Sequence, residues 1–229
     1  MGSTMLILWV TQFLVNSIAG TEPTDGQVTM VTLLPMNESY TFSMKRVLPA
    51  ILIAAEKVCQ PGGPLEGRRI EILHADTHCA ANEAMNEAIT FYINRRPHVL
   101  LGPSCEYALA PVARQARYWK LPVITTAAAR DFSNLKGSAY KTLTLVWSTL
   151  IQLVQGLYTI MERYEWSTTK ILYQPDGLEN RYCHFAGEAL HFELTALGKP
   201  TTYFKFEKIG EMLENMVPEI GNDKAKYIT

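Results

Sequence analysis

The run VLLGPSCEYALAPVARQARYWKLPVIT, residues 99–125, decides the fold. It opens on a short apolar segment, Val99 to Leu101, which Gly102-Pro103 closes; this pattern predicts a buried strand followed by a turn. Pro111 to Trp119 predicts a helix, and Leu121 to Thr125 predicts a second strand. Because strand, helix and strand in this order build a parallel unit, the run indicates a parallel sheet with helices on both faces.

The same alternation extends to both sides of this run. Before it, the predicted strands are Val28–Leu34 and Arg69–Ala75, and the predicted helices are Ala50–Val58, with Pro49 in its first turn, and Ala80–Tyr92. After it, the predicted helices are residues 146–164, 182–197 and 209–220, and the predicted strands are 170–173, 201–206 and 225–229. The pattern therefore predicts an α/β protein with one parallel-sheet lobe at residues 28–144 and a second, incomplete lobe at 145–229.

The composition is that of a globular protein, with 48% hydrophobic and 19% charged residues among 229. The net charge is −1 and no basic block is present, which argues against nucleic acid as a partner. Met5 to Val15 is apolar but about half as long as a bilayer span requires, and small residues follow at Ser17 and Ala19. Residues 1–19 are therefore interpreted as a signal peptide, with a buried helix as the alternative. Secretion would make Asn37, in the sequon Asn37-Glu38-Ser39, a glycosylation site.

Catalytic and metal motifs are weak. His74, Asp76 and His78 recur at a spacing of two, which on a strand would place them on one face as metal ligands. No fourth ligand follows at a suitable spacing, so a strand that runs out into solvent is favoured and no metal is expected. Cys105 beside Glu106 could be an activated nucleophile, but no histidine is placed to act as its base. The expectation is a protein that is not an enzyme.

The run at residues 101–114 resembles the LGPxCEYAxAPVAR segment of natriuretic peptide receptor ectodomains, especially that of the clearance receptor. Residues 33–50, 119–122 and 166–185 carry further similarities, so the resemblance extends from about Val28 to Thr229. It implies the two-lobed fold of type I periplasmic binding proteins, with a peptide hormone bound by the ectodomain.

The resemblance also implies a setting for the chain. Such receptors continue through the second lobe, return to the first and then cross the membrane once, so we expect this chain to be an extracellular fragment that ends inside the second lobe. The full ectodomain would form a homodimer and reach the membrane only through a segment that this chain lacks. A secreted decoy or carrier protein is the alternative, as is a small-molecule cleft binder on the same fold, because a fold does not determine its ligand.

Cysteine roles follow from the same resemblance. Cys79 and Cys105 match the family's first disulfide. Cys183 matches a later cysteine, whose partner would follow the strand that begins near Ala225. Cys59 has no counterpart, and the pairing of Cys59 and Cys183 stays open.

Ligand-facing residues are implied as well. Tyr107 and Arg114 match residues of the first lobe, and Tyr173, Phe185 and Glu188 match residues of the second. Aromatic side chains and arginine concentrate binding energy in interfaces. The alternatives are a core or capping role for Tyr107, a solvated helix face for Arg114 and core packing for Phe185.

The family further implies a chloride ion near the first disulfide. The backbone N–H groups that match Ser104 and Cys105 would hold it, because successive N–H groups after a Gly-Pro turn can form an anion-binding concavity. Thr77 is the candidate for the hydroxyl that completes the site.

Overall fold

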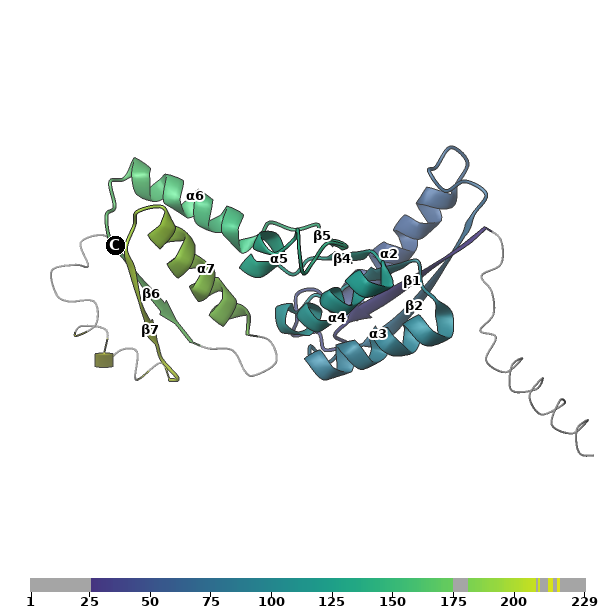
Figure 1. The fold of residues 1–229 in the computed structure, drawn as a ribbon, viewed down its shortest axis with the longest axis horizontal. Coiled ribbons are helices and arrows are strands. Elements are labelled where there is room, and N and C mark those ends of the chain that lie inside the picture. Colours follow the sequence, from purple (N-terminus) through teal and green to yellow (C-terminus); the bar gives the residue numbers. More distant parts are fainter. Residues whose placement is uncertain (1–25, 175–180, 209, 211–213, 216–217, 219–229) are drawn as a thin grey trace, which may run out of the picture.

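The computed structural model describes residues 26–174, 181–208, 210, 214–215 and 218, and contains two parallel β-sheets (Figure 1). The larger sheet has five strands in the order β2-β1-β3-β4-β5, and the smaller pairs β6 with β7. The strands are β1 Gln27–Leu34, β2 Arg69–Asp76, β3 Val99–Leu101, β4 Val123–Thr125, β5 Leu143–Leu145, β6 Thr169–Tyr173 and β7 Thr201–Lys205. The helices are α2 Met44–Cys59, α3 Ala81–Arg95, α4 Glu106–Trp119, α5 Arg130–Asn134, α6 Leu150–Arg163 and α7 Tyr182–Ala196.

This architecture confirms the predicted α/β class with parallel sheets. The strand predicted at residues 99–101 has the observed bounds of β3. The predicted signal peptide and the strand expected at 225–229 lie outside the described residues, as does most of the helix expected at 209–220.

Two helices begin earlier than predicted. Pro49 and Pro111 were expected to open their helices, but they lie inside α2 and α4. Those helices begin instead after the extended residues Ser43 and Cys105. A proline this close to the start of a helix removes one backbone hydrogen bond, and the bonds on either side of it let the helix continue.

The larger sheet also has one strand more than predicted. β5 is three residues long and pairs in parallel with β4, with Val123 opposite Leu143. Its segment LTL is too short to show a reliable alternation of apolar and polar residues, which is why the sequence did not reveal it.

Helices cover both faces of the larger sheet. In Figure 1, α2 lies on one face and α3 and α4 lie on the other. The connection from β1 to β2 and those from β2 to β4 run in opposite directions across the sheet, so right-handed crossovers put their helices on opposite faces. α3 and α4 pack together, with the rings of Tyr92 and Trp119 stacked at 4.2 Å.

The direction of the connections reverses between β1 and β3, which are neighbours in the sheet. In open α/β sheets, ligands bind in the crevice outside the carboxyl ends of the strands at such a point. The loops that follow β1 and β3 are therefore the first place to look for a site.

Candidate functional site

A cleft of about 520 Å³ lies at this reversal point. It is lined by the loops after β1, β3, β4 and β5 and by the start of α7, with these residues: Ser39, Tyr40, Thr41, Phe42, Ser104, Cys105, Glu106, Thr126, Ala128, Trp147, Tyr182 and Cys183. The rings of Phe42 and Trp147 meet edge to face at 5.7 Å. The cleft thus lies between the larger sheet and α7.

Glu106 brings negative charge to this cleft. Its side chain is only 4% exposed, and it accepts a hydrogen bond from the backbone N–H of Ala128 at 2.9 Å. Burial raises the pKa of the Tyr182 hydroxyl, and the nearby Glu106 carboxylate raises it further. The sequence pointed to Glu106 only as a neighbour of Cys105; its burial depends on the loop after β4, which no local pattern indicates.

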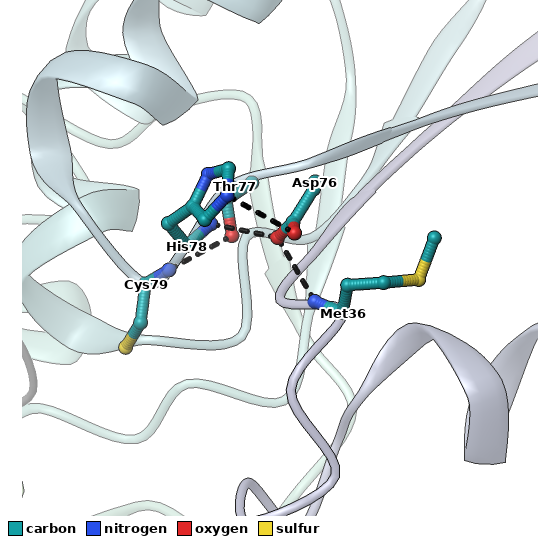
Figure 2. Close-up of polar contacts among 5 residues, drawn as sticks. All are labelled: Met36, Asp76, Thr77, His78 and Cys79. Atoms are coloured by element: carbon teal, nitrogen blue, oxygen red, sulfur yellow. Dashed lines mark hydrogen bonds and ion pairs between the residues drawn. The ribbon is translucent and has the colours of Figure 1, made fainter.

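The turn after β2 places Cys79 just before α3, and Figure 2 shows the polar contacts of this turn. The Asp76 carboxylate accepts hydrogen bonds from the backbone N–H groups of Met36, at 2.9 Å, and His78, at 2.8 Å. Its second oxygen, Oδ2, lies 3.3 Å from Nε2 of the His78 ring. His78 and Cys79 both have positive φ, of 49° and 60°, a conformation that side chains disfavour and that surrounding contacts must hold. Through these hydrogen bonds, the Asp76 carboxylate links the loop that follows β1 to the turn that follows β2.

The same turn argues against a metal site formed by His74, Asp76 and His78. Positive φ at His78 ends the strand alternation that would align all three side chains. No group of three potential ligands with metal geometry occurs in residues 26–174 or in the other described ranges.

The predicted disulfide between Cys79 and Cys105 is confirmed, with a Cα–Cα distance of 5.6 Å. Both cysteines are buried, at the starts of α3 and α4. The bond therefore ties the loop after β3, which lines the cleft, to the loop after β2. Cys183 lines the cleft, and its expected partner lies outside the described residues.

The residues proposed for chloride lie around this disulfide. Thr77 is fully buried, and its hydroxyl accepts a hydrogen bond from the Cys79 N–H at 3.4 Å, which leaves its own proton to donate. The Ser104 hydroxyl donates to the Phe42 carbonyl at 3.3 Å. Among the described residues, none accepts a hydrogen bond from the backbone N–H of Ser104 or Cys105. These two groups precede α4, whose dipole favours an anion, so the donor set fits chloride.

Two of the predicted ligand-facing residues meet through a residue that the sequence did not single out. The guanidinium of Arg181 lies 5.3 Å from the ring centroid of Tyr107 and 6.0 Å from that of Phe185. Tyr107 is in α4, whereas Phe185 is in α7 and packs against both apolar cores. The three side chains therefore join α4 to the start of α7.

A second contact joins the other end of α7 to the larger lobe. Arg130 of α5 forms an ion pair with Glu193 at 2.7 Å, and its guanidinium lies over the Phe192 ring at 5.2 Å. α7 is thus held at both ends.

A smaller pocket, of about 310 Å³, lies between α7 and the sheet of β6 and β7. It is lined by Tyr173, His184, Gly187, Glu188, His191, Phe192 and Tyr203. Two of the predicted ligand-facing residues, Tyr173 and Glu188, thus come together here. The sequence missed the other residues of this pocket, although their spacing along α7 puts several of them on the face of Glu188.

The remaining two predicted residues stand apart from both pockets. Arg114 is two turns from Tyr107 on α4 and places its guanidinium 5.6 Å from the ring centroid of Tyr140. Burial raises the pKa of the Tyr140 hydroxyl, and Arg114 partly opposes this shift. Asn37, the predicted glycosylation residue, lies in an exposed turn.

These features define a ligand-binding protein of the type I periplasmic-binding-protein fold, and the chain belongs to the receptor family ligand binding region, whose model matches residues 46–198. The solved structures that share the fold include an ABC transporter substrate-binding protein from Desulfitobacterium hafniense, with a TM-score of 0.66 at 15% identity over 85% of this chain and 55% of that one. A leucine binding protein from Thermotoga maritima gives a TM-score of 0.63 at 19% identity over 83% of this chain and 53% of that one.

Among curated proteins, the chain is similar to natriuretic peptide receptors. It is 31% identical to atrial natriuretic peptide receptor 3 of Homo sapiens over 206 residues, which are 85% of this chain and 37% of the relative. It is 28% identical to atrial natriuretic peptide receptor 2 of Anguilla japonica over 174 residues, 73% of this chain and 16% of the relative. The chain therefore spans well under half the length of these relatives. None of the helices in the described ranges is long and apolar enough to cross a membrane.

Proposed function

We propose that this chain contains the extracellular peptide-binding region of a natriuretic-peptide-type membrane receptor. The observation that carries the proposal is the pocket between α7 and the smaller sheet, which joins Tyr173 to Glu188. The similarity to receptors named for atrial natriuretic peptide supports a peptide as the ligand. The apolar segment at Met5–Val15 and the exposed Asn37 support secretion and glycosylation.

In such a receptor, peptide binding would act on signalling through the arrangement of the two lobes. α7 contacts the larger lobe at both ends, through Arg181 and Glu193, so a peptide bound beside it could shift the two lobes relative to each other. The full ectodomain would work as a homodimer.

Binding of labelled atrial natriuretic peptide to the secreted chain tests this proposal. We expect saturable binding that unlabelled peptide displaces, and a loss of roughly tenfold or more in affinity for Tyr173→Ala, because buried aromatic anchors dominate peptide affinity. Tyr118→Ala is the matched control, since Tyr118 is 71% exposed on α4, and no residue of α4 lines this pocket. The absence of saturable binding, or equal losses in the two variants, would contradict the proposal.

A chloride ion near the disulfide is the second part of the proposal. Thr77 and the backbone N–H groups of Ser104 and Cys105 would hold it and so brace the loop that leads to Tyr107. We expect peptide affinity to fall when a large anion replaces chloride at constant ionic strength, and Thr77→Val to weaken binding in chloride and to abolish that dependence. Unchanged affinity after replacement would refute the chloride site and leave the peptide proposal standing.

The cleft beside Glu106 supports a different candidate, a small-molecule binder. A volume of about 520 Å³ is within the usual range for small-molecule sites. One of the structures that share the fold is a leucine binding protein. A rise in melting temperature with free amino acids, lost in Glu106→Gln, would favour this candidate.

A further inference from the structure

We propose that one edge of the larger sheet, the edge at which its parallel strands begin, binds a sulfated polysaccharide outside the cell. This inference rests on the proposed function only for its extracellular setting. We call this surface the basic edge, and six exposed cations define it: Arg68, Arg69, Arg95, Arg96, Lys120 and Lys141.

The topology brings these cations together, although the sequence contains no basic block. The five strands are parallel, so they all begin at one edge, and the helices that cross over the sheet end there as well. Neighbouring strands are about 4.8 Å apart, so this edge extends over about 20 Å. Cations stand at the starts of four strands or within four residues before them: Arg68 and Arg69 for β2, Arg95 and Arg96 for β3, Lys120 for β4 and Lys141 for β5.

The charge of the basic edge is not neutralised within the described residues. None of the six cations forms an ion pair there. The two acids that flank the start of β2 have other partners. Glu66 accepts a hydrogen bond from the Gly62 backbone N–H at 2.8 Å, and Glu71 accepts one from the Thr29 hydroxyl at 3.3 Å. Like charges along one edge repel each other, so a polyanion that follows this edge would relieve the repulsion.

Two of the cations occupy backbone positions that favour glycine. Arg96 and Lys120 are the C-caps of α3 and α4, with φ of 44° and 55°. Glycine is the usual residue in this left-handed conformation at a helix end, and a side chain there costs free energy. The helix dipole favours cations near a helix C-terminus. It does not explain Arg68 and Lys141, which belong to no helix.

A sulfated polysaccharide is the polyanion that suits this edge. The two pairs of adjacent arginines supply planar guanidinium groups, which bind oxyanions through two parallel N–H donors. An extracellular protein does not face the anionic lipids of the cytoplasmic leaflet, and it is separated from the nucleic acids of the cell. Sulfate groups in a chain would meet several of the cations at once.

Binding of the secreted chain to heparin tests the proposal. We expect the chain to stay bound to immobilised heparin at physiological ionic strength and to be released as sodium chloride is raised, because salt screens the attraction and opposes counterion release. Fully desulfated heparin and hyaluronan carry carboxylates without sulfates. Both should bind roughly tenfold more weakly or less in surface plasmon resonance, because the cations would lose their sulfate partners.

Paired variants locate the binding surface. Arg95→Gln combined with Arg96→Gln should weaken heparin binding roughly tenfold, because two adjacent guanidinium groups are lost. Lys45→Gln combined with Arg46→Gln is the matched control, since it removes the same charge from exposed positions in the first turn of α2, at the opposite edge of the sheet. It should leave heparin affinity unchanged. Equal losses in the two double variants, or release of the unaltered chain below physiological ionic strength, would overturn the proposal.

A third variant separates binding from folding. Arg96→Gly combined with Lys120→Gly should keep or raise the melting temperature, because glycine adopts the left-handed conformation without strain. It should nevertheless weaken heparin binding severalfold. A lower melting temperature with unchanged heparin affinity would mean that these cations stabilise the helix ends, which would contradict the proposal.

Other ligands distinguish this inference from its competitors and from the proposed function. Tighter binding to phosphatidylserine vesicles or to duplex DNA than to heparin would overturn it. Labelled atrial natriuretic peptide should bind the Arg95→Gln and Arg96→Gln double variant as it binds the unaltered chain, since no residue of the basic edge lines either pocket. A chain that binds heparin but not the peptide would refute the proposed ligand alone. A chain that binds the peptide but not heparin would refute the basic edge alone.

Discussion

Replacing Cys79 and Cys105 together by alanine is expected to lower the free energy of unfolding of the larger lobe by at least about 3.5 kcal/mol. The disulfide joins residues that are 26 positions apart, and a loop of that length removes about 3.5 kcal/mol of chain entropy from the unfolded state. Both side chains are buried, so their truncation adds a packing loss. Urea denaturation followed by circular dichroism measures the change.

Cys59→Ala is the control for this experiment. Cys59 is the last residue of α2 and only half-buried, so its loss should cost under about 1 kcal/mol. The loss of the disulfide should also weaken peptide binding, because the bond positions the loop that leads into α4 and Tyr107. A double variant with the urea midpoint of the unaltered chain would show that the disulfide is dispensable for folding.

The order of strands and helices was predictable because its determinants are local. Val99 to Leu101 is an apolar run closed by Gly102-Pro103, and the bounds of β3 follow from it. The first residues of the helices were less predictable. Proline is common in the first turn of a helix, and this preference places the helix starts at Pro49 and Pro111, which lie inside the observed helices. The observed helices start after Ser43 and Cys105, which are extended and carry no side-chain cap hydrogen bond, so neither residue gives a capping signal in the sequence.

The candidate site was predictable only in part, because its residues come together through tertiary contacts. The resemblance named Tyr173 and Glu188, which share one pocket. It did not reveal that Arg181 links Tyr107 to Phe185, since such a contact depends on how α7 packs against α4. Arg114 also matches a ligand-facing residue of the family, but in this structure its guanidinium lies over the ring of the buried Tyr140 of the same lobe.

Gly102→Ala is expected to be the most damaging single substitution in the larger lobe. Gly102 has φ +91°, a conformation that costs an L-residue about 1 to 2 kcal/mol. A Cβ at this position would lie 2.2 Å from the carbonyl oxygen of Leu33, an atom of the β1 backbone that cannot rotate away. Since β1 and β3 would have to separate at the carboxyl ends that border the cleft, the total loss should reach roughly 3 kcal/mol or more.

The matched control is Gly137→Ala, because a Cβ there meets nothing within 4 Å and the backbone does not require glycine. Alanine at Gly137 should leave stability unchanged or raise it by a few tenths of a kcal/mol. A domain with a net stability of about 5 to 15 kcal/mol can lose 3 kcal/mol and still fold, so the two variants can be compared by urea denaturation and by the yield of secreted protein. Equal urea midpoints for the two variants would mean that β1 and β3 can move apart at this contact without loss of stability. The close approach of Gly102 to Leu33 would then not determine the spacing of these strands beside the cleft.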